Sequence, residues 1–145
     1  MAPRPRARRR WGRFPTTADI GIWARGSSPS ELFEALGLGL FALITDLRTV
    51  RAHAERAVSA SGDDPVSLAV AYLGELLLLQ QTEGFLVRDI EVRTLGTPPT
   101  ALVARVQGEP FDPGRHPARM EVKAITLHAA RVDLGNGRAR LIVDI

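Results

Sequence analysis

The periodicity of apolar residues changes once along this chain, near Gly84, and this change limits the folds that are open to it. Before Gly84, two segments repeat their apolar residues every three or four positions, which is the helical period. After Gly84, apolar and polar residues alternate with a period of two, which predicts strands. Four strands are expected there, the last two joined by a Gly-Asn-Gly hairpin signal at 135–137: 86–95, 101–107, 121–132 and 138–145.

Both helices begin with residues that cap free backbone N–H groups. The run Ser28-Pro29-Ser30-Glu31 is a capping box with proline at the first helical position, and it predicts a helix to about Asp46. Asp64-Pro65 predicts the start of a second helix, and Gly84 is well placed to end it. The apolar stripes are Phe33, Leu36, Leu40, Phe41 and Ile44 in the first helix and Ala69, Tyr72, Leu73, Leu76 and Leu77 in the second.

Two further strands are expected before Gly84, over residues 19–25 and 49–60. The alanines of the second segment are also compatible with a continued helix. The resulting order of elements is β-α-β-α-β-β-β-β. This order predicts an α+β domain in which two helices pack on a largely antiparallel sheet of about six strands.

The composition limits the class of protein. The length of 145 residues and the hydrophobic content of 45% suit one domain, expected over residues 14–145. The absence of cysteine excludes disulfides, thiolate metal sites and a cysteine nucleophile. No apolar run is long enough for a transmembrane helix, and none follows the N-terminal arginines as in a signal peptide. We therefore expect a cytoplasmic protein with no membrane partner.

The charges are distributed unevenly along the chain. Residues 1–13 contain six of the 19 basic residues and no acidic one, and we expect them to form a disordered tail. Such a tail can attract RNA or another polyanion without specificity, and the alternative is a plain solvated tail or a misassigned start codon. Residues 14–145 hold the other 13 basic residues and all 16 acidic ones, so their net charge is −3. The predicted domain is therefore not a basic nucleic-acid-binding domain.

Acidic groups at the two ends of the predicted domain are the first candidates for a ligand site. Asp19 begins the first predicted strand, and Asp144 lies at the end of the last one, next to the terminal carboxylate of Ile145. If these strands are neighbours in the sheet, three oxygen-bearing groups converge on one spot. Such a set suits a hard cation, Ca²⁺ or Mg²⁺, which prefers oxygen ligands. The alternative is that Asp144 is a plain surface residue at a strand end.

A second group of candidates lies between the predicted strands. Two prolines and two glycines fix an irregular loop at 108–116, which carries Glu109, Asp112 and His116. Lys123 is the only lysine among the 19 basic residues and shares a strand face with Glu121. A compact ammonium is suited to point-charge pairing or proton chemistry, so Lys123 is a candidate contact residue. The sequence contains no nucleophile elbow, no phosphate-binding loop and no zinc-protease or dinucleotide motif.

These segments together resemble the archease family. The similarity extends over essentially residues 14–145, in the family's order. The matching motifs are Thr17-Ala18-Asp19-Ile20-Gly21, Glu31-Leu32-Phe33-Glu34-Ala35, Phe41-Ala42-Leu43-Ile44-Thr45-Asp46, Gly108-Glu109-Pro110-Phe111-Asp112 followed by Arg115-His116, Glu121-Val122-Lys123-Ala124-Ile125-Thr126-Leu127-His128, and Val143-Asp144-Ile145. The family usually has histidine before Thr-Ala-Asp, where this chain has Thr16.

The resemblance implies a non-enzymatic protein cofactor of the GTP-dependent RNA ligase that joins 3′-phosphate and 5′-hydroxyl ends in tRNA splicing and RNA repair. Such cofactors promote guanylylation of the ligase and its turnover, and they bind a divalent cation, typically calcium, with magnesium or manganese as alternatives. Carried over to this chain, the metal ligands are Asp19, Asp144 and Ile145. The candidates at the rim, facing the ligase, are Glu121, Lys123, Glu109, Asp112 and His116.

Two other classes of function stay open from the sequence. A stand-alone metal-dependent phosphoesterase would use Asp19 and Asp144 as ligands and Lys123 as electrophile, although a two-metal centre needs more carboxylates than these. An RNA-binding adaptor would act through the Arg-rich tail. The sequence does not identify the RNA, the cation or the oligomeric state.

Overall fold

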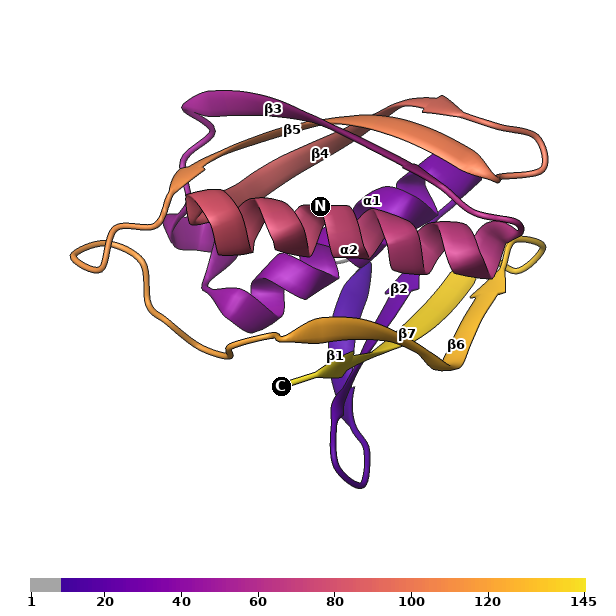
Figure 1. Ribbon diagram of the computed structural model, residues 1–145, viewed down its shortest axis with the longest axis horizontal. Coiled ribbons are helices and arrows are strands. Elements are labelled where there is room, and N and C mark those ends of the chain that lie inside the picture. The colour runs from indigo at the N-terminus through magenta and orange to yellow at the C-terminus, as the bar shows by residue number, and fades with distance from the viewer. Residues whose placement is uncertain (1–8) are drawn as a thin grey trace, which may run out of the picture.

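The two helices of this protein lie between two antiparallel sheets. The computed structural model describes residues 9–145, and Figure 1 shows the helices as the middle of three layers. The first sheet has the strand order β1-β2-β7-β6 and the second β3-β5-β4. The elements are β1 Trp11–Pro15, β2 Ile20–Arg25, α1 Pro29–Ile44, the 3₁₀ turn η1 Leu47–Thr49, β3 Ala54–Ser61, α2 Pro65–Glu83, β4 Phe85–Leu95, β5 Ala101–Pro110, β6 Ala124–Asp133 and β7 Arg138–Asp144.

The predicted α+β class, with two helices and antiparallel strands, is confirmed, but the strands number seven in residues 9–145 and form two sheets. The burial of α1 explains the second sheet. Ten of its 16 residues are buried, including Gly37 and Gly39. A helix that is apolar around most of its circumference needs cover on more than one side. Here α1 contacts β2 on one side and β4 on the other.

The local signals at the helix ends operate as predicted. The Ser28 hydroxyl accepts a hydrogen bond from the Glu31 N–H at 3.2 Å, and the Glu31 carboxylate accepts one from the N–H of Ser27 at 2.8 Å. Asp64 accepts from the Ser67 N–H at 2.7 Å at the start of α2. Gly84 ends α2 with a φ of 65°, a left-handed conformation that glycine adopts without a steric cost.

The N-terminal boundary of the folded part differs from the prediction. Residues 1–13 were expected to be a tail, whereas strand β1 begins at Trp11 and pairs with β2 from Trp11 opposite Ala24 to Pro15 opposite Ile20. Its sequence, Trp-Gly-Arg-Phe-Pro, shows no alternation of apolar and polar residues, so periodicity did not predict a strand here. The strand forms at the sheet edge through backbone pairing with β2. The rest of the predicted tail lies largely in residues 1–8, outside the described residues.

The strand predicted over 49–60 also begins later, at Ala54. The Asp46 carboxylate accepts a hydrogen bond from the Arg48 N–H at 3.0 Å and caps the short turn η1. The N–H of Val50 then bonds to the carbonyl of Leu47 at 3.1 Å, so the chain is turning where a strand was expected. Residues 50–53 connect this turn to β3.

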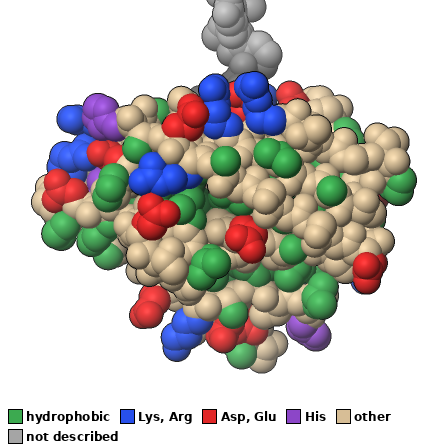
Figure 2. All heavy atoms as spheres, turned by 45° about the horizontal axis from the view of Figure 1, so that its top comes forward, with side chains coloured by type: hydrophobic (Ala, Val, Ile, Leu, Met, Phe, Trp, Pro, Cys, Tyr) green, Lys and Arg blue, Asp and Glu red, His purple; other side chains and the backbone are tan. Residues whose placement is uncertain are grey.

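The outer face of the second sheet is covered by paired charges. Arg105 on β5 lies 3.4 Å from a carboxylate oxygen of Glu55 and 3.0 Å from one of Glu91, on the two flanking strands. In Figure 2 the top of the molecule is turned forward, and acidic and basic side chains are interspersed over that face. Within residues 9–145, no helix has the length and apolar content needed to cross a membrane.

Candidate metal centre

The two ends of the domain meet in the first sheet, as the metal-site hypothesis requires. Strands β2 and β7 are antiparallel neighbours, with Ile20 opposite Val143. The ladder ends at this pair; continued by one residue, the same register would place Asp19, which lies in the turn before β2, opposite Asp144 at the end of β7. Opposed residues of an antiparallel pair point to the same face of the sheet, with their Cβ atoms about 4.5–5.5 Å apart. The side chains of both aspartates can therefore reach a shared ion.

The backbone on each side of this pair is held by hydrogen bonds. The Thr16 hydroxyl accepts from the Asp19 N–H at 3.0 Å and donates to the Asp19 carbonyl at 2.9 Å, closing the turn between β1 and β2. On the other side, the Lys123 N–H donates to the Asp144 carbonyl at 2.7 Å. Thr16, which stands where the family usually has histidine, is thus a structural residue of the turn. The two aspartates are positioned before any ligand arrives.

The charges of Asp19, Asp144 and the terminal carboxylate are not compensated by residues 9–145. Among residues 9–145, the carboxylates of Asp19 and Asp144 and the terminal carboxylate of Ile145 form no ion pair and accept no hydrogen bond. Like charges directly opposite each other on a sheet are destabilising. A divalent cation between them would remove this repulsion.

The donor set fits a hard cation but depends on the chain end. No group of three or more His, Cys, Asp or Glu side chains that could hold a metal occurs in residues 9–145. Two side-chain carboxylates are present, and the third predicted oxygen donor is the carboxylate of Ile145, a residue that is 40% exposed. All three are oxygen ligands, which suit Ca²⁺, Mg²⁺ or Mn²⁺.

The predicted contact residue Lys123 lies beside the end of β7, whereas the strand predicted over 121–132 begins only at Ala124, so Glu121 and Lys123 share no strand face. Ala124 on β6 is opposite Asp144, so the exposed Lys123 is next to the end of β7. The backbone carbonyl of Lys123 also accepts a hydrogen bond from Gln81 Nε2 in the last turn of α2, at 3.3 Å. Sequence reasoning did not find Gln81. The available signal was the pair of glutamines that follows the leucine run of α2.

The loop candidates Glu109 and His116 are placed differently from expectation. Both are buried, with exposures of 5% and 2%. Glu109 accepts hydrogen bonds from the Arg51 N–H at 2.6 Å, from the Arg115 guanidinium and from His116 Nε2 at 3.1 Å. The Asp112 N–H donates to His116 Nδ1 at 2.8 Å, so the imidazole proton that bonds Glu109 is on Nε2. Glu109 and His116 therefore brace the loop and expose little surface to a partner.

Burial alone would raise the pKa of Glu109, but its hydrogen bonds from Arg51, Arg115 and His116 and the charge of Arg115 outweigh burial. The resulting pKa of Glu109 is about 2, against an ordinary value of 4.5. The exposed Asp112 is the one acidic side chain of this loop that faces solvent. In Figure 1 the loop after β5 projects at the left, away from the C-terminus, so the structure does not bring it to the aspartate pair.

The chain is similar to known proteins over nearly its whole length. The model of the Archease protein family (MTH1598/TM1083) matches residues 11–145. A protein archease of Pyrococcus abyssi is 40% identical over 141 residues, which cover 94% of this chain and 99% of the relative. A protein archease-like of Drosophila melanogaster is 37% identical over 134 residues, which cover 89% and 86%. The solution structure of Methanobacterium thermoautotrophicum protein 1598 matches with a TM-score of 0.77 and 32% identity, covering 95% of this chain and all of that one.

Proposed function

Because the chain belongs to the archease family, we propose that it is a non-enzymatic, divalent-cation-binding activator of a 3′-phosphate/5′-hydroxyl RNA ligase. In this function it promotes guanylylation and turnover of the ligase during tRNA splicing or RNA repair, in the cytoplasm. The observation that supports the proposal is the antiparallel pairing of Ile20 with Val143, because Asp19 precedes Ile20 and Asp144 follows Val143 at the same end of β2 and β7.

The chemistry of the aspartate pair supports the cation part of the proposal. Asp19, Asp144 and the terminal carboxylate of Ile145 would hold the ion, calcium first among the alternatives. The ion would offset phosphate charge and orient phosphate oxygens. The residues of this chain contribute the position: Thr16 and Lys123 fix the backbone of the two aspartates through the hydrogen bonds described above. The site is therefore presented where β2 begins and β7 ends, on the two central strands of the first sheet.

The exposed side chains around the pair are the proposed contacts with the ligase. Lys123 and Glu121 adjoin the end of β7 and are exposed, so they can pair with charged groups of a partner. Asp112 is a further candidate on the exposed loop. Glu109 and His116 act indirectly in this proposal, because they keep the loop in shape.

The small number of carboxylate ligands at the site, two side chains, counts against the alternative of a stand-alone phosphoesterase. A two-metal centre holds ions about 3.5–4 Å apart and needs several bridging and terminal ligands. The described residues supply no group of three side-chain ligands. We therefore prefer an accessory function to an enzymatic one.

Guanylylation of the ligase from the same source tests the proposal. Wild-type protein should stimulate labelling of the ligase by radioactive GTP, while Asp19→Asn and Asp144→Asn should lose most of the stimulation. Asp63→Asn is a matched control, because Asp63 is an exposed aspartate that makes no side-chain hydrogen bond or ion pair with the described residues. Full stimulation by both site variants would reject the metal site, and no stimulation by wild-type protein would reject the activator function.

A further inference from the structure

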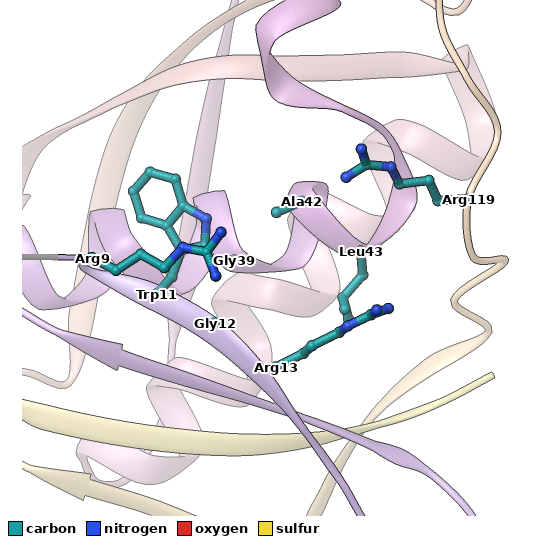
Figure 3. Close-up of a pocket in the computed structure, with 8 residues that line it drawn as sticks. All are labelled: Arg9, Trp11, Gly12, Arg13, Gly39, Ala42, Leu43 and Arg119. Atoms are coloured by element: carbon teal, nitrogen blue, oxygen red, sulfur yellow. The ribbon is translucent and has the colours of Figure 1, made fainter.

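A polar pocket, separate from the aspartate pair, lies between β1 and α1 on the inner side of the first sheet. It has a volume of about 310 Å³ and is lined by Arg9, Trp11, Gly12, Arg13, Gly39, Ala42, Leu43 and Arg119. Figure 3 shows the three arginine side chains around it: Arg9 beside the Trp11 indole, and Arg13 and Arg119 on either side of Leu43. Its lining thus contains three cations and no acidic residue.

Small residues of the helix make room for this pocket. A Cβ atom at Gly39 would lie 2.8 Å from a methyl carbon of Ile22 on β2 and 3.2 Å from Cβ of Trp11 on β1, so the first sheet packs closely against α1 at this glycine. Ala42 follows one turn later on the same helix face. The pocket floor is therefore made of small side chains, while its rim carries the long arginines.

Two of the three arginines of this pocket have no acidic partner within residues 9–145, and the third shares its partner with another arginine. The guanidinium groups of Arg9 and Arg13 form no ion pair or hydrogen bond with the described residues, and the sequence before Arg9 contains no acidic residue. Arg119 approaches a carboxylate oxygen of Asp46 at 3.5 Å. That carboxylate is already engaged by Arg48, at 3.1 and 2.9 Å.

This arrangement differs from that of the arginines on the second sheet, where Arg105 is shared between two glutamates. Three guanidinium groups that face one small volume repel each other unless an anion lies between them. Guanidinium binds phosphate through paired N–H donors with a geometry that matches the phosphate oxygens. The backbone of Arg119 is held by a hydrogen bond to the Ile44 carbonyl at 3.0 Å, so its side chain projects from a fixed point.

We propose that this pocket binds one nucleotide, with the phosphate between Arg9, Arg13 and Arg119 and the base against the Trp11 indole. Aromatic side chains beside basic groups are the common means of binding single nucleotides and unpaired strands. The volume is at the lower end of the range for small-molecule sites, which suits one nucleotide unit. The unit is either a free mononucleotide or one position of a single-stranded RNA. The site is independent of the aspartate pair, because it selects an anion.

Calorimetry on the full chain tests the proposal, with inorganic phosphate, adenosine monophosphate and a ten-nucleotide single-stranded RNA as probes. The triple variant Arg9→Gln, Arg13→Gln, Arg119→Gln should bind AMP or RNA at least tenfold more weakly than wild type. Binding of the RNA but not of AMP would identify single-stranded RNA as the ligand. Binding of both AMP and the RNA would show that the pocket recognises a single nucleotide unit. For RNA, the slope of log K against log[salt] should become shallower by about 0.7 in the triple variant, since one phosphate contact on a single strand contributes about 0.7 to that slope.

A matched control removes the same charge from the other face of the first sheet. Arg131, Arg138 and Arg140 line a separate pocket there, and their replacement by glutamine should change affinity less than twofold. Equal losses of affinity in both triple variants would mean unspecific electrostatic attraction and would overturn the proposal. A loss of affinity in the control variant alone would also overturn it, as would the absence of binding of every probe to wild type. Trp11→Leu should weaken the binding of AMP and leave the affinity for inorganic phosphate unchanged. An unchanged affinity for AMP would reject the contact between the base and Trp11. Thermal unfolding of each variant verifies that it is folded.

Discussion

Lys123 donates its backbone N–H to the carbonyl of Asp144 across 2.7 Å, and this bond holds the end of β7 against the segment that leads into β6. On its other side, β7 is paired with β2 up to Val143. The last residues of the chain are therefore enclosed between two neighbours in the middle of a sheet. The proposed ligand at Ile145 directly follows this paired strand, and its contribution can be tested.

A single glycine appended after Ile145 should weaken Ca²⁺ binding by about tenfold or more. The added residue moves the terminal carboxylate by roughly 3.3 Å along the strand direction, away from Asp19 and Asp144. The matched control is Ile145→Val, which keeps the carboxylate in place. Calorimetric titration with calcium measures both. Equal affinity of the extended protein and wild type would remove the chain end from the ligand set.

The aspartate pair should affect stability with opposite sign in the absence and presence of cation. Without metal, Asp144→Asn should be as stable as wild type or more stable by up to about 1 kcal/mol, because it removes the repulsion from Asp19. With calcium at 100 times its dissociation constant, wild type should gain about 2.7 kcal/mol and the variant much less. Thermal unfolding with and without EDTA measures this. A variant that loses stability without metal would show that the repulsion is absent.

The buried Glu109 should make the free energy of unfolding decrease at acid pH. Its pKa is lowered from 4.5 to about 2 in the folded protein, so its stabilising contribution is complete above pH 4.5 and is lost as the pH falls toward 2. A shift of this size corresponds to about 3 kcal/mol. Glu109→Gln should lower the free energy of unfolding at pH 7 and flatten its decline between pH 4.5 and 2.

Urea unfolding at a series of pH values measures the effect of Glu109. The control is Glu91→Gln, because Glu91 lies in exposed ion pairs with Arg93 and Arg105 that contribute little to stability. An unchanged acid profile in Glu109→Gln would mean that other groups cause the acid sensitivity.

Two glycines in helices should respond to alanine with opposite sign. Gly39→Ala should destabilise the protein by about 1–3 kcal/mol, because its Cβ would lie 2.8 Å from Ile22 of β2 in the packed interface between α1 and the first sheet. Gly74→Ala should stabilise it by about 0.5–1 kcal/mol, since no atom lies within 4 Å of its Cβ position and alanine favours the helix. Urea unfolding of the two variants measures the difference, and equal effects would show that the first sheet does not pack on Gly39.

The sequence by itself determined the two helices, their ends and the hairpin before β7. Ser28 and Asp64 bond to N–H groups three residues ahead, and Gly84 adopts its left-handed turn in place, so each signal involves residues that are neighbours in the chain. The resemblance in the sequence also identified the family and the candidate ligands Asp19, Asp144 and Ile145.

Only the tertiary structure decided which strands pair. The hydrogen bonds between strands join backbone groups, which are the same in nearly every residue, so the sequence of one strand does not specify its partner. It added β1 to the sheet, divided the strands between the two sides of α1 and buried Glu109 with His116. It also brought Arg9 and Arg13 together with Arg119, which lies more than 100 positions later in the chain. Local propensity cannot specify such contacts, since their free energy depends on the packing of distant segments.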